Sequence, residues 1–245
     1  GTELARLAGH DDQLSSLQLS ADGARIVTAS DDHTARVWDP QTGTELAIVG
    51  ERKGAEWHGP VFSRDGARLC AGSQDGKARI WSVPDFSEVR AFDVGGGIVW
   101  DTLFDPSGEH LVTGSADGII RFWEIASGKE ARRFIGHEGA IYAAMFSPDG
   151  ARLVSASADK RAMVWDVASG ERVIIIEGHD AAVSRASFSP DGARILTSSG
   201  DGSARIWEAG TGAEVLAFKG HGDWVSTAAF NPAGDRVVTA SNDMT

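Results

Sequence analysis

Serine, histidine and aspartate recur together in this chain at spacings that would suit nucleophilic catalysis. One stretch carries His137, then Ser155 and Ser157, then Asp159. A histidine that takes the proton of a serine and is oriented by an aspartate is the arrangement of serine hydrolases. The chain also has seven histidines, which are common metal ligands, and a non-repeating pair of acid and base types in Glu56 and His58. Each of these interpretations depends on whether the residues are unique in the chain.

The serine, histidine and aspartate belong to a unit that is repeated along the chain. The period is marked by Trp38, Trp81, Trp123, Trp165 and Trp207, which are separated by 43, 42, 42 and 42 residues. Six turns are in phase with these tryptophans, and the fourth has the sequence Ser-Pro-Asp-Gly at residues 147–150. Because the Ser, His and Asp pattern recurs from copy to copy, it indicates a structural role, whereas a catalytic function has to be argued from a unique site. We therefore expect no catalytic residues.

Each repeat has the pattern of four short β-strands. In the fourth copy, the strands are predicted at residues 140–146, 151–157, 161–165 and 171–176, with a proline-containing turn after the first. Four antiparallel strands within 42 residues leave no room for a crossover helix. The predicted fold class is therefore all-β, and parallel α/β folds are excluded.

Gly-His, an Asp-Gly turn and Trp-Asp, recurring about every 42 residues, resemble the WD-repeat (WD40) family. The near-identity of the copies resembles prokaryotic arrays of such repeats. The resemblance covers the chain and implies a β-propeller of four-stranded antiparallel blades, in a single domain over residues 1–245. We expect six repeat units, five of them complete, with the opening GTELARL as an outermost fourth strand. The last repeat reaches SNDMT without its third strand, so the expected ring is open or incompletely closed. Either the chain is a fragment of a longer array or a partner strand fills the gap.

In this family, His, Ser or Thr, Asp and Trp of one repeat form a structural hydrogen-bonded tetrad. Such a role is physically reasonable because a buried indole N–H and a buried imidazole both need partners. The hydroxyl partner is left open between two candidates in each repeat: Thr28 or Ser30, Ser155 or Ser157, and Thr197 or Ser199. The other expected tetrad residues are His10, Asp32, Trp38, His137, Asp159, Trp165, His179, Asp201 and Trp207. Since most histidines occupy this position, and the Asp-Gly turns lack the ligand spacing of a calcium loop, no metal site is expected.

A partner is expected to bind where the copies differ, at positions that resemble the family's top-face contact positions. Carried over to this chain, the predicted partner-binding residues are Glu56, His58, Gln74, Ile98, Trp100, Tyr142, Trp224 and Ser226. Their aromatic members have the composition favoured at binding hot spots. The alternative for these aromatics is packing between neighbouring repeats, and Trp57 is assigned to the core. Two periodic sets of arginines are expected to pair with carboxylates on the sheet surfaces. The first set lies two residues before the repeat tryptophan (Arg36, Arg79, Arg121, Arg205), and the second follows the Asp-Gly turn (Arg25, Arg68, Arg152, Arg194).

Repeats two and three depart most from the pattern. Arg52-Lys53 and Val94-Gly95 replace Gly-His there, so a complete tetrad is not expected in either repeat. Pro60 lies within a predicted first strand, which should be irregular because proline cannot donate to the ladder. The glycine run at residues 95–97 predicts a loop.

Composition limits the classes of partner. The net charge of −12 disfavours binding to nucleic acid or anionic membranes, and no apolar run approaches the length of a membrane span. The single cysteine, Cys70, requires no oxidising compartment, so a cytoplasmic location is expected. The predicted function is a non-enzymatic scaffold or sensor that binds a protein or peptide on the top face, without a cofactor. The alternatives are self-assembly into a homo-oligomer through the unfinished terminal repeat and, third, a propeller hydrolase or lyase.

Overall fold

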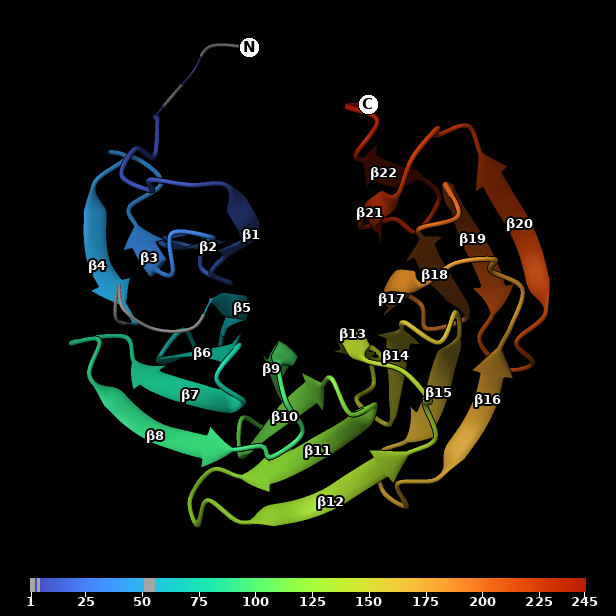
Figure 1. Cartoon of the computed structure of the whole chain (residues 1–245), viewed down its shortest axis with the longest axis horizontal. Coiled ribbons are helices and arrows are strands. Elements are labelled where there is room, and N and C mark those ends of the chain that lie inside the picture. The colour runs from blue at the N-terminus through green and yellow to red at the C-terminus, as the bar shows by residue number, and fades with distance from the viewer. Residues whose placement is uncertain (1–2, 4, 51–55) are drawn as a thin grey trace. The chain divides into compact units, whose positions relative to one another are not determined.

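The computed structural model describes residues 3, 5–50 and 56–245, and every regular element in them is a β-strand (Figure 1). Within that part of the chain, no helix is long and apolar enough to cross a bilayer. Internal contacts divide the chain into two units. Unit 1 comprises residues 1–115 and 121–131, and unit 2 comprises residues 116–120 and 132–245.

Unit 1 contains two complete sheets and most of a third. The first sheet is formed by β1 (Leu14–Leu19), β2 (Ile26–Ser30), β3 (Ala35–Trp38) and β4 (Glu45–Val49). The second is formed by β5 (Trp57–Phe62), β6 (Arg68–Ser73), β7 (Lys77–Ser82) and β8 (Glu88–Asp93). The third is formed by β9 (Val99–Phe104), β10 (His110–Ser115), β11 (Ile119–Glu124) and β12 (Glu130–Ile135). The strands follow one another in chain order, as in an antiparallel blade of a propeller.

Unit 2 contains two complete sheets and one of two strands. The fourth sheet is formed by β13 (Ile141–Phe146), β14 (Arg152–Ser157), β15 (Ala162–Asp166) and β16 (Arg172–Ile176). The fifth is formed by β17 (Val183–Phe188), β18 (Arg194–Ser199), β19 (Ser203–Glu208) and β20 (Glu214–Lys219). The sixth consists of β21 (Val225–Phe230) and β22 (Val237–Ser241). The predicted absence of a third strand in the last repeat is confirmed for the described residues.

Hydrophobic cores lie between consecutive sheets within each unit. In unit 1, β5 packs against β1 and β2, and β9 packs against β5 and β6; in unit 2, β17 packs against β13 and β14. At the junction of sheets four and five, Val154 and Ala156 of β14 face Val183 and Ala186 of β17. A single four-stranded sheet cannot bury both of its faces, so the stacking of neighbours supplies the core.

The strands of the fourth repeat begin and end within one residue of their predicted bounds. The turns account for this agreement: the amide of Gly150 donates to the carbonyl of Ser147 at 2.8 Å, and Gly150 has a φ of 72°. The first strand of repeat two is irregular, as expected: the pairing of β5 with β6 shifts between His58 and Val61, and Gly59 has a φ of 53°. The first strands of the other sheets also have a register shift, so this irregularity is not specific to Pro60. Residues 95–97 form the predicted loop.

One prediction about the ends is wrong. The opening GTELARL was expected to form a fourth strand, but Glu3 and residues 5–10 contain no strand, and residues 1, 2 and 4 lie outside the described residues. A fourth strand needs a third strand to pair with, and the last repeat provides none. The segment instead passes close to the first sheet, where a Cβ built on Gly43 would lie 2.7 Å from the carbonyl oxygen of Arg6. The prediction of one domain with an open or incompletely closed ring concerns the placement of the two units, and it stays a prediction.

Candidate functional site

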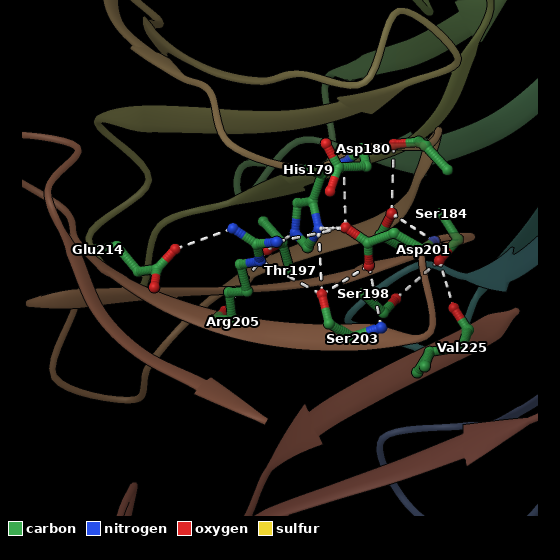
Figure 2. Close-up of polar contacts among 12 residues, drawn as sticks. His179, Asp180, Ser184, Thr197, Ser198, Asp201, Ser203, Arg205, Glu214 and Val225 are labelled. Carbon is green, nitrogen blue, oxygen red and sulfur yellow. Dashed lines mark hydrogen bonds and ion pairs between the residues drawn. The ribbon is translucent and has the colours of Figure 1, made fainter. Parts of the chain in front are cut away.

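The fifth repeat has the complete set of polar contacts expected of the family, and Figure 2 shows those of His179 with Asp201 and Thr197. His179 Nδ1 lies 2.8 Å from Asp201 Oδ2, and His179 Nε2 lies 2.7 Å from Thr197 Oγ1. The indole N–H of Trp207 donates to the same Thr197 oxygen at 2.8 Å. An ionised carboxylate can only accept hydrogen bonds, so the ring proton resides on Nδ1, and Nε2 accepts from the threonine hydroxyl. The contacts form one continuous chain of donors from indole to carboxylate.

Repeats one and four have the same geometry, and together the three repeats resolve which hydroxyl is used. In repeat four, His137 lies 2.7 Å from both Asp159 and Ser155, and Trp165 donates to Ser155 at 2.8 Å. The hydroxyls of Thr28, Ser155 and Thr197 contact the imidazole. Ser30, Ser157 and Ser199, the other candidates, accept from the backbone amide of the tetrad aspartate. The nine predicted His, Asp and Trp residues are therefore brought together in threes, repeat by repeat.

This hydrogen-bond network joins strands of one sheet, and its buried groups are inaccessible to a substrate. Ser155 is fully buried and its oxygen already accepts from Trp165, which is 1% exposed. Burial alone would raise the pKa of Asp159, yet hydrogen bonds from His137 and from two backbone amides hold that pKa below its usual 3.8. Burial lowers the pKa of His179 despite the nearby Asp201. A neutral imidazole between an ionised aspartate and a hydroxyl satisfies every polar group of the tetrad.

Repeats two and three depart from the tetrad in different ways. Repeat three keeps the pair in which Trp123 donates to Thr113 at 3.0 Å. Repeat two has Ala71 at the hydroxyl position, a loss that could have been noticed by aligning the repeats. Its Trp81 packs against Trp57 with ring centroids 5.2 Å apart, and the Arg79 guanidinium lies 5.1 Å from the Trp57 ring centroid. Aromatic packing thus replaces the polar chain in repeat two, and the assignment of Trp57 to the core is confirmed.

The periodic arginines play two roles, and one of them was not expected. Arg36 is buried, donates to Glu45 at 2.7 Å and lies 3.5 Å from Asp32; Arg205 has equivalent contacts with Glu214 and Asp201 (Figure 2). The arginines of these ion pairs are thus buried, whereas the carboxylates of Glu45 and Glu214 stay partly exposed. In the second set, Arg68 and Arg152 bind carbonyl oxygens instead of carboxylates, and Arg68 donates to the carbonyl of Gly108. Arg152 donates to the backbone carbonyls of Gly192 and Ala209 in the following repeat. These side chains therefore connect neighbouring sheets.

Four of the predicted partner-binding residues of unit 1 contact one another in two pairs, His58 with Trp100 and Gln74 with Glu56. His58 and Trp100 occupy the same position in successive repeats, and their rings lie 4.7 Å apart at 39°. The backbone amide of Gln74 donates to the backbone carbonyl of Glu56 at 3.0 Å, and Gln74 is exposed. His58 Nε2 is buried without a hydrogen-bond partner among the described residues. Burial lowers the pKa of His58, and the Glu56 and Asp31 carboxylates oppose this effect. Ile98 is half-buried beside them on the loop before β9.

The predicted residues of unit 2 are more dispersed. Tyr142 is half-buried on β13. Trp224 is half-buried and its ring lies over Gly200, where an added Cβ would be 2.9 Å from Trp224 Cε3. Part of the Trp224 surface is therefore buried by packing against the preceding repeat, which was the alternative to partner binding for this residue. Ser226 is exposed and donates to the carbonyl of Ala240 at 3.2 Å. Whether all eight residues contact one partner stays a prediction.

Other reactive groups are scarce. Among residues 3, 5–50 and 56–245, no group of three or more His, Cys, Asp or Glu side chains has a metal-binding arrangement. Burial raises the pKa of the Cys70 thiol to about 12, which makes it inert at neutral pH. Cys70 is a core residue of β6, as expected.

The family model described as "WD domain, G-beta repeat" matches six segments: residues 1–39, 59–82, 88–124, 128–166, 170–208 and 212–245. These segments cover most of the chain, and the matches recur in phase with its sheets. A search of curated proteins gave no significant match.

Proposed function

The chain belongs to the WD domain, G-beta repeat family, and on that premise we propose that it is a non-enzymatic module that binds a protein or peptide on its top face. WD repeats typically mediate protein–protein interactions and are generally not enzymes. The net charge of −12 makes a protein a better partner than nucleic acid or an anionic membrane. Residues 1–245 are proposed as one interaction domain. A cytoplasmic location is proposed with it, because a single cysteine needs no oxidising compartment.

The contact between His58 and Trp100 is the observation that carries this proposal. The two residues belong to repeats two and three, where the tetrad histidine is replaced. They occupy one repeat position, contact each other at a ring-centroid distance of 4.7 Å, and are both half-buried. These side chains differ from their counterparts in the other repeats and keep part of their surface exposed, which supports a role in recognition.

The chemistry of these residues suits a peptide. Because burial lowers the pKa of His58, its imidazole is neutral at pH 7, and the exposed part of the ring can pack against a ligand. Trp100 offers apolar surface, and aromatic residues of this kind dominate binding energy at interfaces. The half-buried Glu56 and the exposed Gln74 supply polar groups around them.

The proposal is tested by the triple variant Trp100→Ala, Tyr142→Ala, Trp224→Ala. Partners are identified by affinity purification and mass spectrometry, and the affinity of each purified partner for the wild-type chain and for the variant is then measured. Leu46→Ala is the matched control, because Leu46 is an exposed apolar residue on the outer strand β4. We expect the triple variant to lose at least tenfold in affinity, since truncated hot-spot residues cost about 2 kcal/mol or more each. Unchanged affinity in the triple variant would remove the proposal.

A second function is favoured by the two-stranded sixth sheet. Strand β22 pairs with β21, and no strand of the described residues pairs with its other edge. Exposed strand edges recruit further strands, so we propose strand pairing with another chain as the alternative role, including pairing between copies. Mass measurement in solution over a range of concentrations tests the pairing of copies, and a strict monomer at high concentration would count against it.

A further inference from the structure

His58 and Trp100, here called the aromatic pair, have a short side chain as their neighbour on the side of repeat one. Both residues of the pair are half-buried, and their rings lie 4.7 Å apart at 39°. Ser15 occupies the corresponding position of repeat one, on strand β1, which packs against β5. Ser15 is exposed, and its side chain is too short to cover an aromatic ring. The aromatic pair therefore keeps surface against which a side chain of a ligand can pack.

Two carboxylates lie close to the aromatic pair. The backbone amide of Asp31 donates to the carbonyl of Gln13 at 3.0 Å, and that of Gln74 donates to the carbonyl of Glu56 at the same distance. Asp31 and Gln74 therefore occupy one position of successive repeats, and Gln13 and Glu56 occupy another. Burial lowers the pKa of His58, and the carboxylates of Glu56 and Asp31 oppose this effect. Both negative charges are thus near enough to act on a ligand that contacts the aromatic pair.

This acidic character does not extend to repeats four and five. At the positions that hold Glu56 and Asp31 in the first repeats, these later repeats have residues with small, uncharged side chains. They are Ala140, Ala158, Ala182 and Gly200. The combination of two carboxylates with two aromatic rings is therefore a departure from the repeat, and the pattern of the scaffold does not account for it.

The two carboxylates also lack a cation within the described part of the chain. Other carboxylates of unit 1 are paired with arginine, and Glu45 lies 2.7 Å from Arg36. Asp31 and Glu56 form no ion pair with any of the residues 3, 5–50 and 56–245. Two like charges that act on one side chain repel each other, so a cation that a ligand places between them is stabilised by both.

The aromatic pair suits a cation with a flat face. Because burial lowers the pKa of His58, its ring is uncharged at neutral pH and does not repel a cation. The face of an indole attracts cations, and tryptophan does so more strongly than the other aromatic side chains. A guanidinium group is planar, stacks on such rings and donates several N–H groups to carboxylates, whereas the lysine ammonium is a point charge. Arginine therefore matches both the rings and the carboxylates.

We propose that this site binds a segment of a partner protein through one arginine side chain. The guanidinium packs against the aromatic pair and donates to the carboxylates of Asp31 and Glu56. The net charge of −12 acts in the same direction, because it attracts a basic segment from a distance. This inference rests on the protein-binding function proposed above, and it specifies the chemistry of the partner. All residues of the site belong to unit 1.

The test begins with a library of random peptides displayed on phage, which is selected on the immobilised 245-residue chain. A variant with Asp31→Asn and Glu56→Gln is used in parallel, and it keeps the shape of both side chains without their charge. The matched control has Glu109→Gln and Glu208→Gln, which remove the same net charge from two exposed glutamates outside the site. We expect arginine to be enriched over the unselected library on the wild-type chain and on the control, and not on the Asp31→Asn, Glu56→Gln variant.

The most enriched peptide is then synthesised twice, once with arginine and once with citrulline, which has nearly the same shape and no charge. Fluorescence anisotropy should show about tenfold weaker binding of the citrulline peptide to the wild-type chain. The Asp31→Asn, Glu56→Gln variant should bind the arginine peptide about tenfold more weakly than the control does, and should bind both peptides almost equally. Higher salt should weaken the binding of the arginine peptide to the wild-type chain more than to this variant.

Independent effects of citrulline and of the carboxylate substitutions, or a wild-type selection without enrichment of arginine, would overturn the arginine inference. The protein-binding function itself would stand in that case if Trp100→Ala still weakened binding of the selected peptides. Peptides that bind equally well to the wild-type chain and to Trp100→Ala, or a selection that yields no binding peptide, would remove both. The citrulline comparison uses the unaltered chain, so it decides the arginine inference even if a substitution disturbs the fold.

Discussion

Removing one buried hydroxyl, in the variant Ser155→Ala, should destabilise the fourth repeat far more than the loss of one ordinary hydrogen bond. Ser155 is fully buried on β14 and joins two partners, the imidazole of His137 at 2.7 Å and the indole of Trp165 at 2.8 Å. Alanine removes the donor to one partner and the acceptor of the other. Both partners are themselves buried, so water cannot replace the lost oxygen without opening the sheet.

The expected magnitude follows from the two groups left without partners. A buried polar group that loses its hydrogen bond costs about 1–3 kcal/mol. Two such groups give roughly 2–6 kcal/mol, and partial rearrangement of His137 toward Asp159 places the expectation near about 3 kcal/mol. Ser226→Ala is the matched control, because Ser226 is exposed and makes one contact, with the Ala240 carbonyl. Its cost should stay within about 0.5 kcal/mol.

Urea unfolding followed by tryptophan fluorescence measures the overall effect, and hydrogen exchange of the peptides that contain β14 and β15 locates it. The local measurement is needed because repeat arrays do not always unfold in a single two-state step. We expect faster exchange in the fourth repeat of Ser155→Ala and unchanged exchange in the first sheet. If Ser155→Ala unfolds within 0.5 kcal/mol of the Ser226→Ala control (about the scatter of surface substitutions) and exchange is unaltered, the tetrad does not stabilise the fold in the way described.

Three further predictions concern packing and pH. Leu17→Asp on β1 should lower the free energy of unfolding in urea by less than about 1 kcal/mol, because Leu17 is 59% exposed. Ala186 lies at the same repeat position but is only 3% exposed, so Ala186→Asp should lower it by about 3 kcal/mol or more. Gly200→Ala should displace the Trp224 ring, since the added Cβ would lie 2.9 Å from it, and should change the tryptophan emission spectrum. Burial lowers the pKa of His179 below 6.5 in the folded chain, so its contribution to stability is present above pH 6.5 and is lost as the pH falls. The free energy of unfolding should therefore decrease as the pH is lowered from about 8 to about 5, and it should decrease less in the variant His179→Gln.

The strand pattern could be predicted from the sequence because its determinants are local. A turn such as residues 147–150 needs proline and glycine at fixed places, and the glycine adopts a left-handed conformation in the structure. Six copies in phase also remove the ambiguity that a single short apolar run would have. The bounds of the fourth repeat's strands were accordingly correct to within one residue.

The choice of hydroxyl within the tetrad could not be made from the sequence. Ser155 and Ser157 are two residues apart on one strand and therefore face the same side of the sheet, so spacing alone does not separate them. The pairing register decides, because Ser155 lies opposite Met163, two residues before Trp165, and there its oxygen reaches the indole. The second group of arginines was mispredicted for a related reason. Arg152 donates to backbone carbonyls of the next repeat. Every residue has a backbone carbonyl, so the sequence does not indicate which of them accept a hydrogen bond from a side chain.

Repeats two and three lose different parts of the tetrad. Repeat three lacks the histidine but keeps the hydrogen bond from Trp123 to Thr113, whereas repeat two lacks both the histidine and the hydroxyl. A buried polar group that loses its partner is costly. Ala71 replaces the hydroxyl, and the Gly-His pair is also absent from the sequence of that repeat. Trp57 packs at 5.2 Å against Trp81 and is covered by Arg79. Its own Nε1 atom is buried without a hydrogen-bond partner among the described residues. The same repeat contains His58 on its first strand. The His58 ring contacts Trp100, and its Nε2 atom is buried without a partner among the described residues. The part of the scaffold that departs from the repeat is therefore the part with polar and aromatic groups to offer a ligand.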